Sequence, residues 1–408
     1  MREFFLQSLM TRLPSLVGIF VVFVCLLALS VYRRGISWKL VMNTALVHLV
    51  LGCIMLHWSW GQIAIGAVAS GVNALYQAAD IGSTFLFGAL AQPAAGGWGF
   101  VFAFRALPII VFFGALMALL SYFGVVNFVV SIIKRLLQPL WGTRGAETTC
   151  AVANSFLGQT EAPLLVKEYL SHMSESCMFL VMVSGMGTIT VGLIAMFGAM
   201  GVPLQHLLAA SIMAIPATVM CAKMVYPEKG DTTCPEICAD IGGTPPASYT
   251  EAIARGTSDG LMLALNVGAM LIAFLSLIGL INMVLGYISP LLTLEKILGY
   301  LFVPFGWMMG FGGEQALKIG ELVGMKIVAN ETVAYSALVK SGLSERAVML
   351  ATYALCGFSN FSSIGIQVGG IGALAPAQRS VLSRLGVRAV FTAALANLYS
   401  AFVVNLIF

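Results

Sequence analysis

Two short polar stretches interrupt a chain that is otherwise almost entirely apolar. The first, GMKIVANETVAY, runs from Gly324 to Tyr335 and contains Lys326, Asn330 and Glu331. A carboxylate near the middle of a bilayer costs roughly 2.5 to 3.5 kcal/mol even on a lenient insertion scale, so an intramembrane Glu usually has a function and a partner. The simpler alternative is that Glu331 lies in a water-exposed loop between two spans.

The second polar stretch weakens the loop interpretation. NSFLGQTEAPLL, from Asn154 to Leu165, places Gln159, Thr160 and Glu161 between apolar runs. Those runs are far shorter than the roughly 20 residues that a membrane span needs, which favours a re-entrant hairpin. A carboxylate accepts hydrogen bonds from hydroxyls, and an amide can both donate and accept, so these residue types suit a polar ligand. One such interruption in each half of the chain indicates a repeated architecture.

The composition defines the class of protein. Of 408 residues, 59% are hydrophobic and 9% are charged, and the mean hydropathy is +0.96, whereas soluble domains carry about 25% charged residues. The sequence therefore predicts an all-α polytopic membrane protein. The net charge of +4 arises from Lys and Arg residues between spans, a placement that sets topology and gives no sign of nucleic-acid binding.

Two features resemble processing or metal signals but are better explained otherwise. The first apolar run, Pro14 to Tyr32, is longer than a signal-peptide core and precedes the basic turn RRGISWK, so it is interpreted as the first span. The eight Cys are scattered, and Cys234 and Cys238, the only close pair in a loop, have no His nearby. Reduced thiols without a metal role are therefore favoured.

The hydrophobic pattern predicts eight spans, two re-entrant hairpins and several interfacial helices. The expected spans are Pro14–Tyr32, Leu40–Trp58, Phe102–Val126, Met178–Met200, Pro203–Tyr226, Gly260–Ile288, Ala347–Leu374 and Val390–Phe408. The hairpins cover Glu147–Leu170 and Gly312–Gly342, and the interfacial helices lie around Ile63–Tyr76, Phe128–Trp141 and Leu294–Trp307. The fourth span is expected to unwind at SGMGTITVG and the seventh at CGFSNFSSIGIQVGG.

Loop charges predict which side each end faces. The polar segment Pro227 to Ser258 and a turn marked by Arg379, Arg384 and Arg388 are expected in the cytoplasm, because basic loops stay inside. With eight crossings, this places both termini outside. Two basic residues near the N-terminus oppose that orientation.

The order hairpin, broken span, ordinary span occurs twice, with opposite orientation expected for the two copies. Inverted repeats with broken helices indicate a secondary transporter whose site lies at the membrane midplane. Exposed backbone is tolerated there only where it lines a cavity or is buried in protein. Four parts follow: residues 1–145 with the first three spans, 146–226 with the first copy, 227–310 with the cytoplasmic loop and sixth span, and 311–408 with the second copy.

These residues resemble the concentrative nucleoside transporter family, in its bacterial sodium-coupled form, over almost the whole length. The family signature G-x-K-x-x-x-N-E-F-V-A-[YMF] appears from Gly324 to Tyr335, with Thr332 in place of the usual Phe. GQTEAPL, CGFSNFSSIG and GSTFLFGAL, Gly82 to Leu90, carry the resemblance further. Four long motifs in order are far more specific than a lone short motif.

The resemblance implies a homotrimer in which spans one, two, three and six form a scaffold. The hairpins and broken spans would form a transport domain that moves as an elevator. By similarity, one group of residues would meet the nucleobase and another the ribose hydroxyls, with Phe358 packing nearby. The nucleobase group is Gln159, Thr160 and Glu161, and the ribose group is Glu331, Asn360 and Ser363.

The resemblance also implies a coupling cation. Sodium-coupled relatives are similar to this chain at Asn154, the Leu157 carbonyl, Thr188 and the Ile189 carbonyl. A hard cation prefers such an all-oxygen shell. The sequence thus predicts sodium-driven symport of nucleosides, of the uridine, cytidine and adenosine class, across the bacterial inner membrane into the cell. Proton coupling remains the alternative, and no preference between purine and pyrimidine follows.

Other functions have weaker support in the sequence. An intramembrane enzyme could use Glu161 and Glu331 as an acid–base pair, but no nucleophile–base signature accompanies them. A passive channel and a free nucleobase carrier also stay open. Asn360 and Ser363 could simply join helices by hydrogen bonds, and Lys326 could pair with a carboxylate in the hairpin or extend to the membrane surface.

Overall fold

The computed structural model describes residues 2–92, 101–141, 143, 145–228, 246–290 and 292–408. Within these ranges the secondary structure is entirely helical. Seven stretches of the described chain are long and apolar enough to cross a membrane. The predicted seventh span, Ala347–Leu374, does not qualify by length because it is divided into two separate helices, α17 (Glu345–Leu355) and α18 (Phe361–Leu374).

The first third of the chain contains two spans, a long helix and a third span. Its α-helices are α1 (Arg2–Leu29), α2 (Trp38–Leu56), α3 (Ser59–Phe87), α5 (Phe102–Arg105), α6 (Leu107–Tyr122) and α7 (Val125–Trp141). The interfacial helix expected around Ile63–Tyr76 is part of α3 and continues well beyond both predicted ends. The segment contains no proline, and its many Ala residues favour helix strongly enough to offset its glycines.

The first copy begins with a short hairpin. The elements of the whole first copy are α8 (Gly145–Ala153), the 3-10 turn η3 (Ala162–Val166), α9 (Lys167–Leu170), α10 (Glu175–Gly187), α11 (Val191–Ala199) and α12 (Leu204–Val225). The predicted unwinding of the fourth span is confirmed between α10 and α11. Thr190 ends the break because its side chain accepts a hydrogen bond from the Leu193 amide at 3.3 Å and so caps α11.

The sixth span and the second copy follow. Their α-helices are α13 (Tyr249–Ile288), α14 (Leu294–Met308), α15 (Gly313–Val328), α16 (Glu331–Val339), then α17, α18 and α19 (Arg379–Ile407). Two boundaries differ from the prediction. The basic turn at Arg379–Arg388 is already the first part of α19. α13 starts inside the expected loop because Ser248 caps it: the Ser248 side chain accepts from the Glu251 amide at 3.2 Å, and the Glu251 carboxylate accepts from the Ala247 amide at 2.7 Å.

Contacts at the helix ends establish that the copies are inverted. At one end of the bundle, Lys223 near the end of α12 donates to Ser176 near the start of α10 at 3.1 Å. Arg384, in the first part of α19, pairs with a carboxylate at the start of α10. At the other end, Arg346 near the start of α17 bonds to Asn405 near the end of α19. α10 and α17 therefore start from opposite ends, and α12 and α19 run antiparallel.

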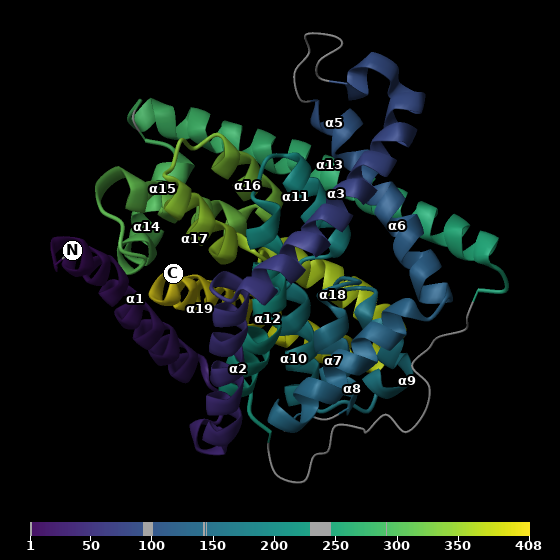
Figure 1. Cartoon of the computed structure of the whole chain (residues 1–408), viewed down its shortest axis with the longest axis horizontal. Coiled ribbons are helices and arrows are strands. Elements are labelled where there is room, and N and C mark those ends of the chain that lie inside the picture. The colour runs from purple at the N-terminus through teal and green to yellow at the C-terminus, as the bar shows by residue number, and fades with distance from the viewer. Residues whose placement is uncertain (1, 93–100, 142, 144, 229–245, 291) are drawn as a thin grey trace.

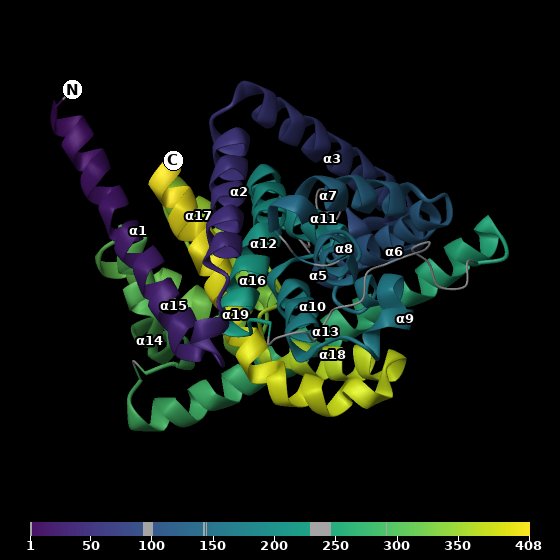
Figure 2. The same cartoon turned by 90° about the horizontal axis from the view of Figure 1, so that it is seen from below.

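The core lies around these inverted elements. About 94% of the apolar window of α12 and 83% of that of α19 are buried inside the chain, against 22% for α6 and 12% for α13. Figure 1 shows α10, α12 and α19 in the middle, with α1 and α6 near opposite edges. Figure 2 shows both termini on one side of the molecule, where the Arg12 guanidinium donates to the Phe408 carbonyl.

The two breaks cross at a pair of glycines. Gly357, between α17 and α18, has φ of +94°, and a Cβ there would lie 2.6 Å from the Gly187 carbonyl oxygen at the end of α10. Only glycine combines this conformation with this approach. Asn397 of α19 reinforces the crossing by donating from Nδ2 to the same oxygen at 2.8 Å.

Candidate functional site

All seven residues predicted to contact substrate line one cavity of about 130 Å³. Hairpin tips and the break between α17 and α18 supply its polar wall, and α11 and α13 supply the rest. The residues predicted from the sequence are Gln159, Thr160, Glu161, Glu331, Phe358, Asn360 and Ser363. The sequence did not indicate Asn330, Thr332, Ser362 or, from α13, Asn266 as lining residues.

The tip of the second hairpin is buried and is held by hydrogen bonds within the chain. Asn330 caps α16 by accepting from the Val333 amide at 2.9 Å, so Glu331 is the first residue of that helix. Glu331 is 5% exposed, which contradicts the water-exposed loop alternative. Its two oxygens accept from Asn360 Nδ2 at 3.0 Å and from the Thr332 hydroxyl at 3.4 Å. A carboxylate has about four acceptor positions, so two more donors can be accommodated.

The start of α18 holds Asn360 in one orientation. Its Oδ1 caps the helix by accepting from the Ser363 amide at 3.0 Å, and it also accepts from the Ser362 hydroxyl at 2.6 Å. Because Oδ1 is committed in this way, Nδ2 faces Glu331. The amide therefore serves as a fixed link between the break in the seventh span and the tip of the second hairpin.

Gln159 of the first hairpin joins the same network through Ser363 and is oriented by Gln367, a residue that the sequence did not indicate. Its Nε2 approaches the Ser363 hydroxyl at 3.4 Å, and its Oε1 accepts from Gln367 Nε2 at 3.1 Å. Gln367 is fully buried behind Gln159. The available signal was spacing, since Gln367 follows Ser363 by four residues and so occupies the same helix face.

The tip of the first hairpin is more open. Gly158 has φ of +109° and lies against Thr190 at the start of α11. Thr160 is half-buried and packs on Gly370 of α18, whereas Glu161 is exposed. Glu161 also lines a second cavity of about 250 Å³, whose wall includes Asp259 of α13. Glu161 thus lies where the hairpin meets the sixth span.

Asn154, one of the predicted cation ligands, has an unpartnered buried oxygen. It is 1% exposed, and its Nδ2 donates to the Ser184 hydroxyl at 2.8 Å, while its Oδ1 has no hydrogen-bond partner. Thr188 is also buried and donates to the Ser184 carbonyl at 2.8 Å, which leaves its hydroxyl lone pairs available. An unpartnered buried oxygen costs about 1–3 kcal/mol unless something binds it.

The remaining predicted cation ligands are backbone carbonyls. Ile189 follows Thr188 in the break and receives only a long 3.4 Å contact at its carbonyl, from the Ser211 hydroxyl. Leu157 is buried and precedes Gly158 in the turn of the hairpin. The donor set consists of neutral oxygens, which fits a hard monovalent cation better than a soft metal.

Lys326 follows neither of the two predictions made for its side chain. It is 1% exposed, so it does not reach the membrane surface, and the hydrogen bonds of its ammonium group go to neutral oxygens. Nζ donates to the carbonyls of Ala354 and Cys356 at 3.0 and 2.8 Å, and to Asn397 Oδ1 at 2.8 Å. The lysine therefore closes the carboxyl end of α17.

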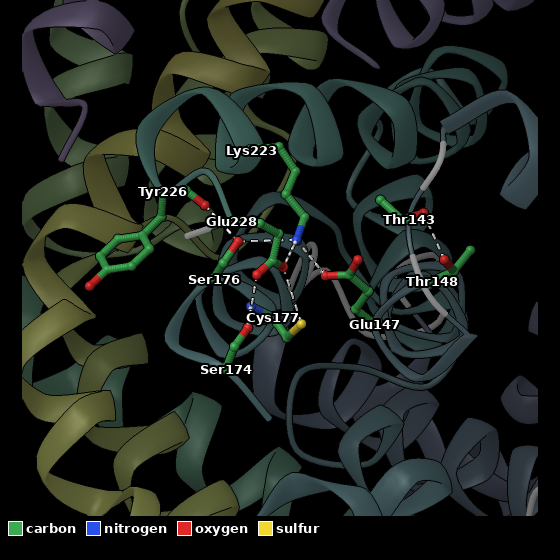
Figure 3. A network of polar contacts seen from close by, with 9 residues as sticks. All are labelled: Thr143, Glu147, Thr148, Ser174, Ser176, Cys177, Lys223, Tyr226 and Glu228. Carbon is green, nitrogen blue, oxygen red and sulfur yellow. Dashed lines mark hydrogen bonds and ion pairs between the residues drawn. The ribbon is translucent and has the colours of Figure 1, made fainter. Parts of the chain in front are cut away.

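A second buried lysine forms an ion-pair network away from the cavity (Figure 3). Lys223 Nζ lies 2.6 Å from Glu147 at the start of α8 and 2.9 Å from Glu228 after α12. Glu147 and Glu228 also lie near Cys177 in an arrangement that could hold a metal, but the lysine ammonium already occupies the space between the carboxylates. Burial of Glu228 opposes its charge, yet Lys223 holds the pKa of Glu228 below its usual range. Cys234 and Cys238 lie outside the described residues.

Comparison with known proteins places this architecture in a family. Models for the N-terminal and C-terminal parts of Na+-dependent nucleoside transporters match residues 17–90 and 206–405, and a model described as a nucleoside-recognition gate matches residues 103–204. Together these models cover most of the chain.

Individual relatives match over nearly the full length. The chain is 40% identical to an uncharacterized transporter of Haemophilus influenzae, over 97% of this chain and 98% of the relative. It is 37% identical to the nucleoside permease NupC of Helicobacter pylori, again over 97% and 98%. The mouse sodium/nucleoside cotransporter 1 is 34% identical, over 97% of this chain and 64% of the mouse protein.

A solved structure agrees equally well. CNTnw in an inward-facing substrate-bound state superimposes with a TM-score of 0.93 at 39% identity, covering 98% of this chain and 99% of that one. Members of this group are nucleoside transporters and not enzymes. Such proteins cross the membrane many times, and in bacteria they lie in the inner membrane. This chain belongs to the concentrative nucleoside transporter family.

Proposed function

We propose that the protein imports nucleosides by symport with sodium, with one binding cavity between the two hairpin tips. The observation that carries this proposal is the convergence of polar side chains from both inverted copies on one cavity. Glu331 and Asn360 come from the second copy and Gln159 and Glu161 from the first. A secondary transporter needs such a site, built where its repeats meet near the midplane.

Glu331, Asn360 and Ser363 are the proposed ribose ligands. The Glu331 carboxylate already accepts two hydrogen bonds within the chain and retains capacity for adjacent ribose hydroxyls. Hydrogen bonds to a charged acceptor are worth about 1.5–3 kcal/mol each. A site built around hydroxyls rejects analogues that lack them, because its own buried polar groups would be left unpaired.

Gln159, Thr160 and Glu161 are the proposed nucleobase ligands, and Phe358 would pack beside the base. The Gln159 amide is oriented by Gln367, so it presents a defined donor and acceptor face. Glu161 lies at the open side of the cavity, toward α13. A free nucleobase would meet only this half of the site and would forgo the hydrogen bonds to Glu331.

Sodium is the proposed coupling ion, bound by Asn154 Oδ1, the Thr188 hydroxyl and the carbonyls of Leu157 and Ile189. The unpartnered buried oxygen of Asn154 supports this assignment. A membrane potential of about 100 mV supplies roughly 2.3 kcal/mol per charge. At about 1.36 kcal/mol per tenfold, this energy supports about 50-fold accumulation of nucleoside. Ion and nucleoside must then improve each other's binding by equal factors.

The proposed motion is an elevator in a homotrimer. Residues 1–145 and 227–310 would contain the scaffold, and residues 146–226 and 311–408 the moving transport domain. The tight α6–α13 pair supports a rigid scaffold, since a Cβ on Gly256 would lie 2.4 Å from the Gly114 carbonyl oxygen. Glu161 and Asp259, which line the same 250 Å³ cavity, would then lie at the sliding interface.

The test is uptake of labelled uridine and adenosine into proteoliposomes under an imposed sodium or proton gradient. We expect accumulation that is driven by sodium and abolished when sodium is removed. Accumulation driven by protons alone would replace sodium by the proton as coupling ion. Uptake that never exceeds equilibrium would indicate a passive channel, and uptake of free uracil as fast as uridine would indicate a nucleobase carrier.

A further inference from the structure

The Lys326 ammonium, at the centre of the second copy, has no role in the proposed transport reaction. Its three hydrogen bonds go to the carbonyls of Ala354 and Cys356 and to Asn397 Oδ1, all at 2.8 to 3.0 Å. A buried charge needs compensation. Here the compensation comes from neutral oxygens at the carboxyl end of α17, which also carries the negative end of that helix's dipole.

The three acceptors favour the charged form of the lysine. Carbonyl oxygens cannot donate, and the orientation of Asn397 is fixed because its Nδ2 donates to the Gly187 carbonyl at 2.8 Å. A neutral amine has two N–H groups, so its lone pair would point at the third oxygen. An ammonium has three and satisfies all of them.

The first copy has a matching place without a lysine. In the inverted order α8 corresponds to α15, α10 to α17, and α12 to α19. Where Lys326 reaches the end of α17, the arm of the first hairpin brings Asn154 to the end of α10. There the Asn154 Oδ1 is unpartnered, and Asn154 and Thr188 both bond to Ser184 of α10. The two places touch through Asn397 and through the contact of Gly187 with Gly357.

We propose that the Lys326 ammonium is a tethered equivalent of the coupling cation, filling in the second copy the position that the first copy leaves for a cation from solution. The proposal rests on the cation-coupled function proposed above. Each inverted copy then needs one positive charge at the end of its broken helix. Only the charge in the first copy can dissociate, so a single cation accompanies each nucleoside.

The central experiment replaces Lys326 by Met, whose side chain ends near the position of the lysine Cε and leaves the place of Nζ open. We expect the Hill coefficient for sodium activation of uptake to rise from about one to about two, as a second sodium occupies the vacated oxygens. The sodium concentration for half-activation should rise about tenfold, since a dissociable ion replaces a tethered one. Thermal stabilisation of the purified protein by NaCl should shift to higher concentration in parallel.

A matched control replaces the other buried lysine. Lys223→Met should lower the melting temperature while the Hill coefficient stays near one, because Lys223 contacts carboxylates and lies outside both cation positions. A folded Lys326→Met protein with unchanged one-ion behaviour would overturn the proposal. So would a folded variant that sodium neither activates nor stabilises at any concentration.

A measurement on the unmodified protein covers the case in which Lys326→Met does not fold. The ratio of sodium to nucleoside flux, taken from the reversal potential in proteoliposomes, is expected to be one. Two sodium ions per nucleoside would overturn the tethered-cation proposal while leaving sodium symport intact. Uptake without any sodium dependence would instead overturn the proposed coupling ion, so the two failures are distinguishable.

Discussion

The two hairpin tips carry the same residue type in very different surroundings. Glu331 opens the nine-residue helix α16, is 5% exposed and accepts hydrogen bonds from Asn360 and Thr332. Glu161 precedes a five-residue 3-10 turn, is exposed, and lines a cavity shared with α13. Hydrogen bonds within the chain therefore hold Glu331 in place before substrate binds. Glu161 instead lies in a cavity between the first hairpin and α13.

Local sequence explains this difference. Asn330 precedes Glu331 and caps α16, so the carboxylate lies at the positive end of a true α-helix. No side chain caps the turn after Glu161, and Pro163 within that turn removes an amide donor. The comparison teaches that acidic tips in matching places of an inverted repeat need not share one role.

The strongest challenge to this comparison is Glu331→Gln. We expect uptake to fall at least about 100-fold, because the amide lacks the negative charge, and hydrogen bonds from the ribose hydroxyls to a charged acceptor are worth about 1.5–3 kcal/mol each. Initial uptake rates of uridine in proteoliposomes provide the measurement. Retained thermal stabilisation by sodium would show that the variant is folded, and full uptake would reject Glu331 as a ribose ligand.

Glu161→Gln tests the other tip with a matched change. We expect a smaller loss, about tenfold and mainly in the substrate concentration for half-maximal uptake, since the Glu161 side chain is less enclosed by the chain than that of Glu331. The same uptake series measures it. A loss as large as that of Glu331→Gln would contradict the view that Glu331 is held in place before substrate binds and Glu161 is not.

The variant Asn154→Ala tests whether the first copy, unlike the second, needs a cation from solution. The variant removes the unpartnered oxygen, and we expect the sodium concentration for half-activation to rise about tenfold, equivalent to about 1.4 kcal/mol. Nucleoside binding at saturating sodium should change far less. Uptake with unaltered sodium dependence would contradict the assignment of Asn154 as a cation ligand.

Much of this organisation was predictable from the sequence. Short polar interruptions predicted both hairpins and both breaks, because Asn330, Thr190 and Asn360 are good capping residues between runs too short to span a membrane. The start of α13 was also predictable in principle, since Ser248 and Glu251 have capping-box spacing.

The partners of the buried lysines were not predictable. Lys326 binds carbonyls of residues 28 and 30 positions away and a side chain 71 positions away. Backbone oxygens carry no residue signature, and only the crossing of the two breaks makes them available. Lys223 and Glu147, 76 positions apart, likewise meet only once the first hairpin packs against α12.

The Lys223 network sharpens the comparison between the copies with the smallest expected effect on transport. It fastens the start of α8 to α10 and α12, far from the cavity, through an ion pair whose side chains are 7% and 2% exposed. Removing one partner of a buried pair costs about 3–5 kcal/mol, whereas replacing both by apolar residues is often nearly neutral.

Glu147→Gln should therefore lower the melting temperature clearly, and the double variant Glu147→Leu with Lys223→Met should recover most of that loss. Both proteins should keep the sodium and uridine dependence of uptake within about twofold, because pairs distant from a site usually act additively. A large shift in sodium dependence in the double variant would mean that the fastening at the end of α8 also sets the geometry at Asn154, and the first copy would then be organised by its ion pair as the second is by Lys326.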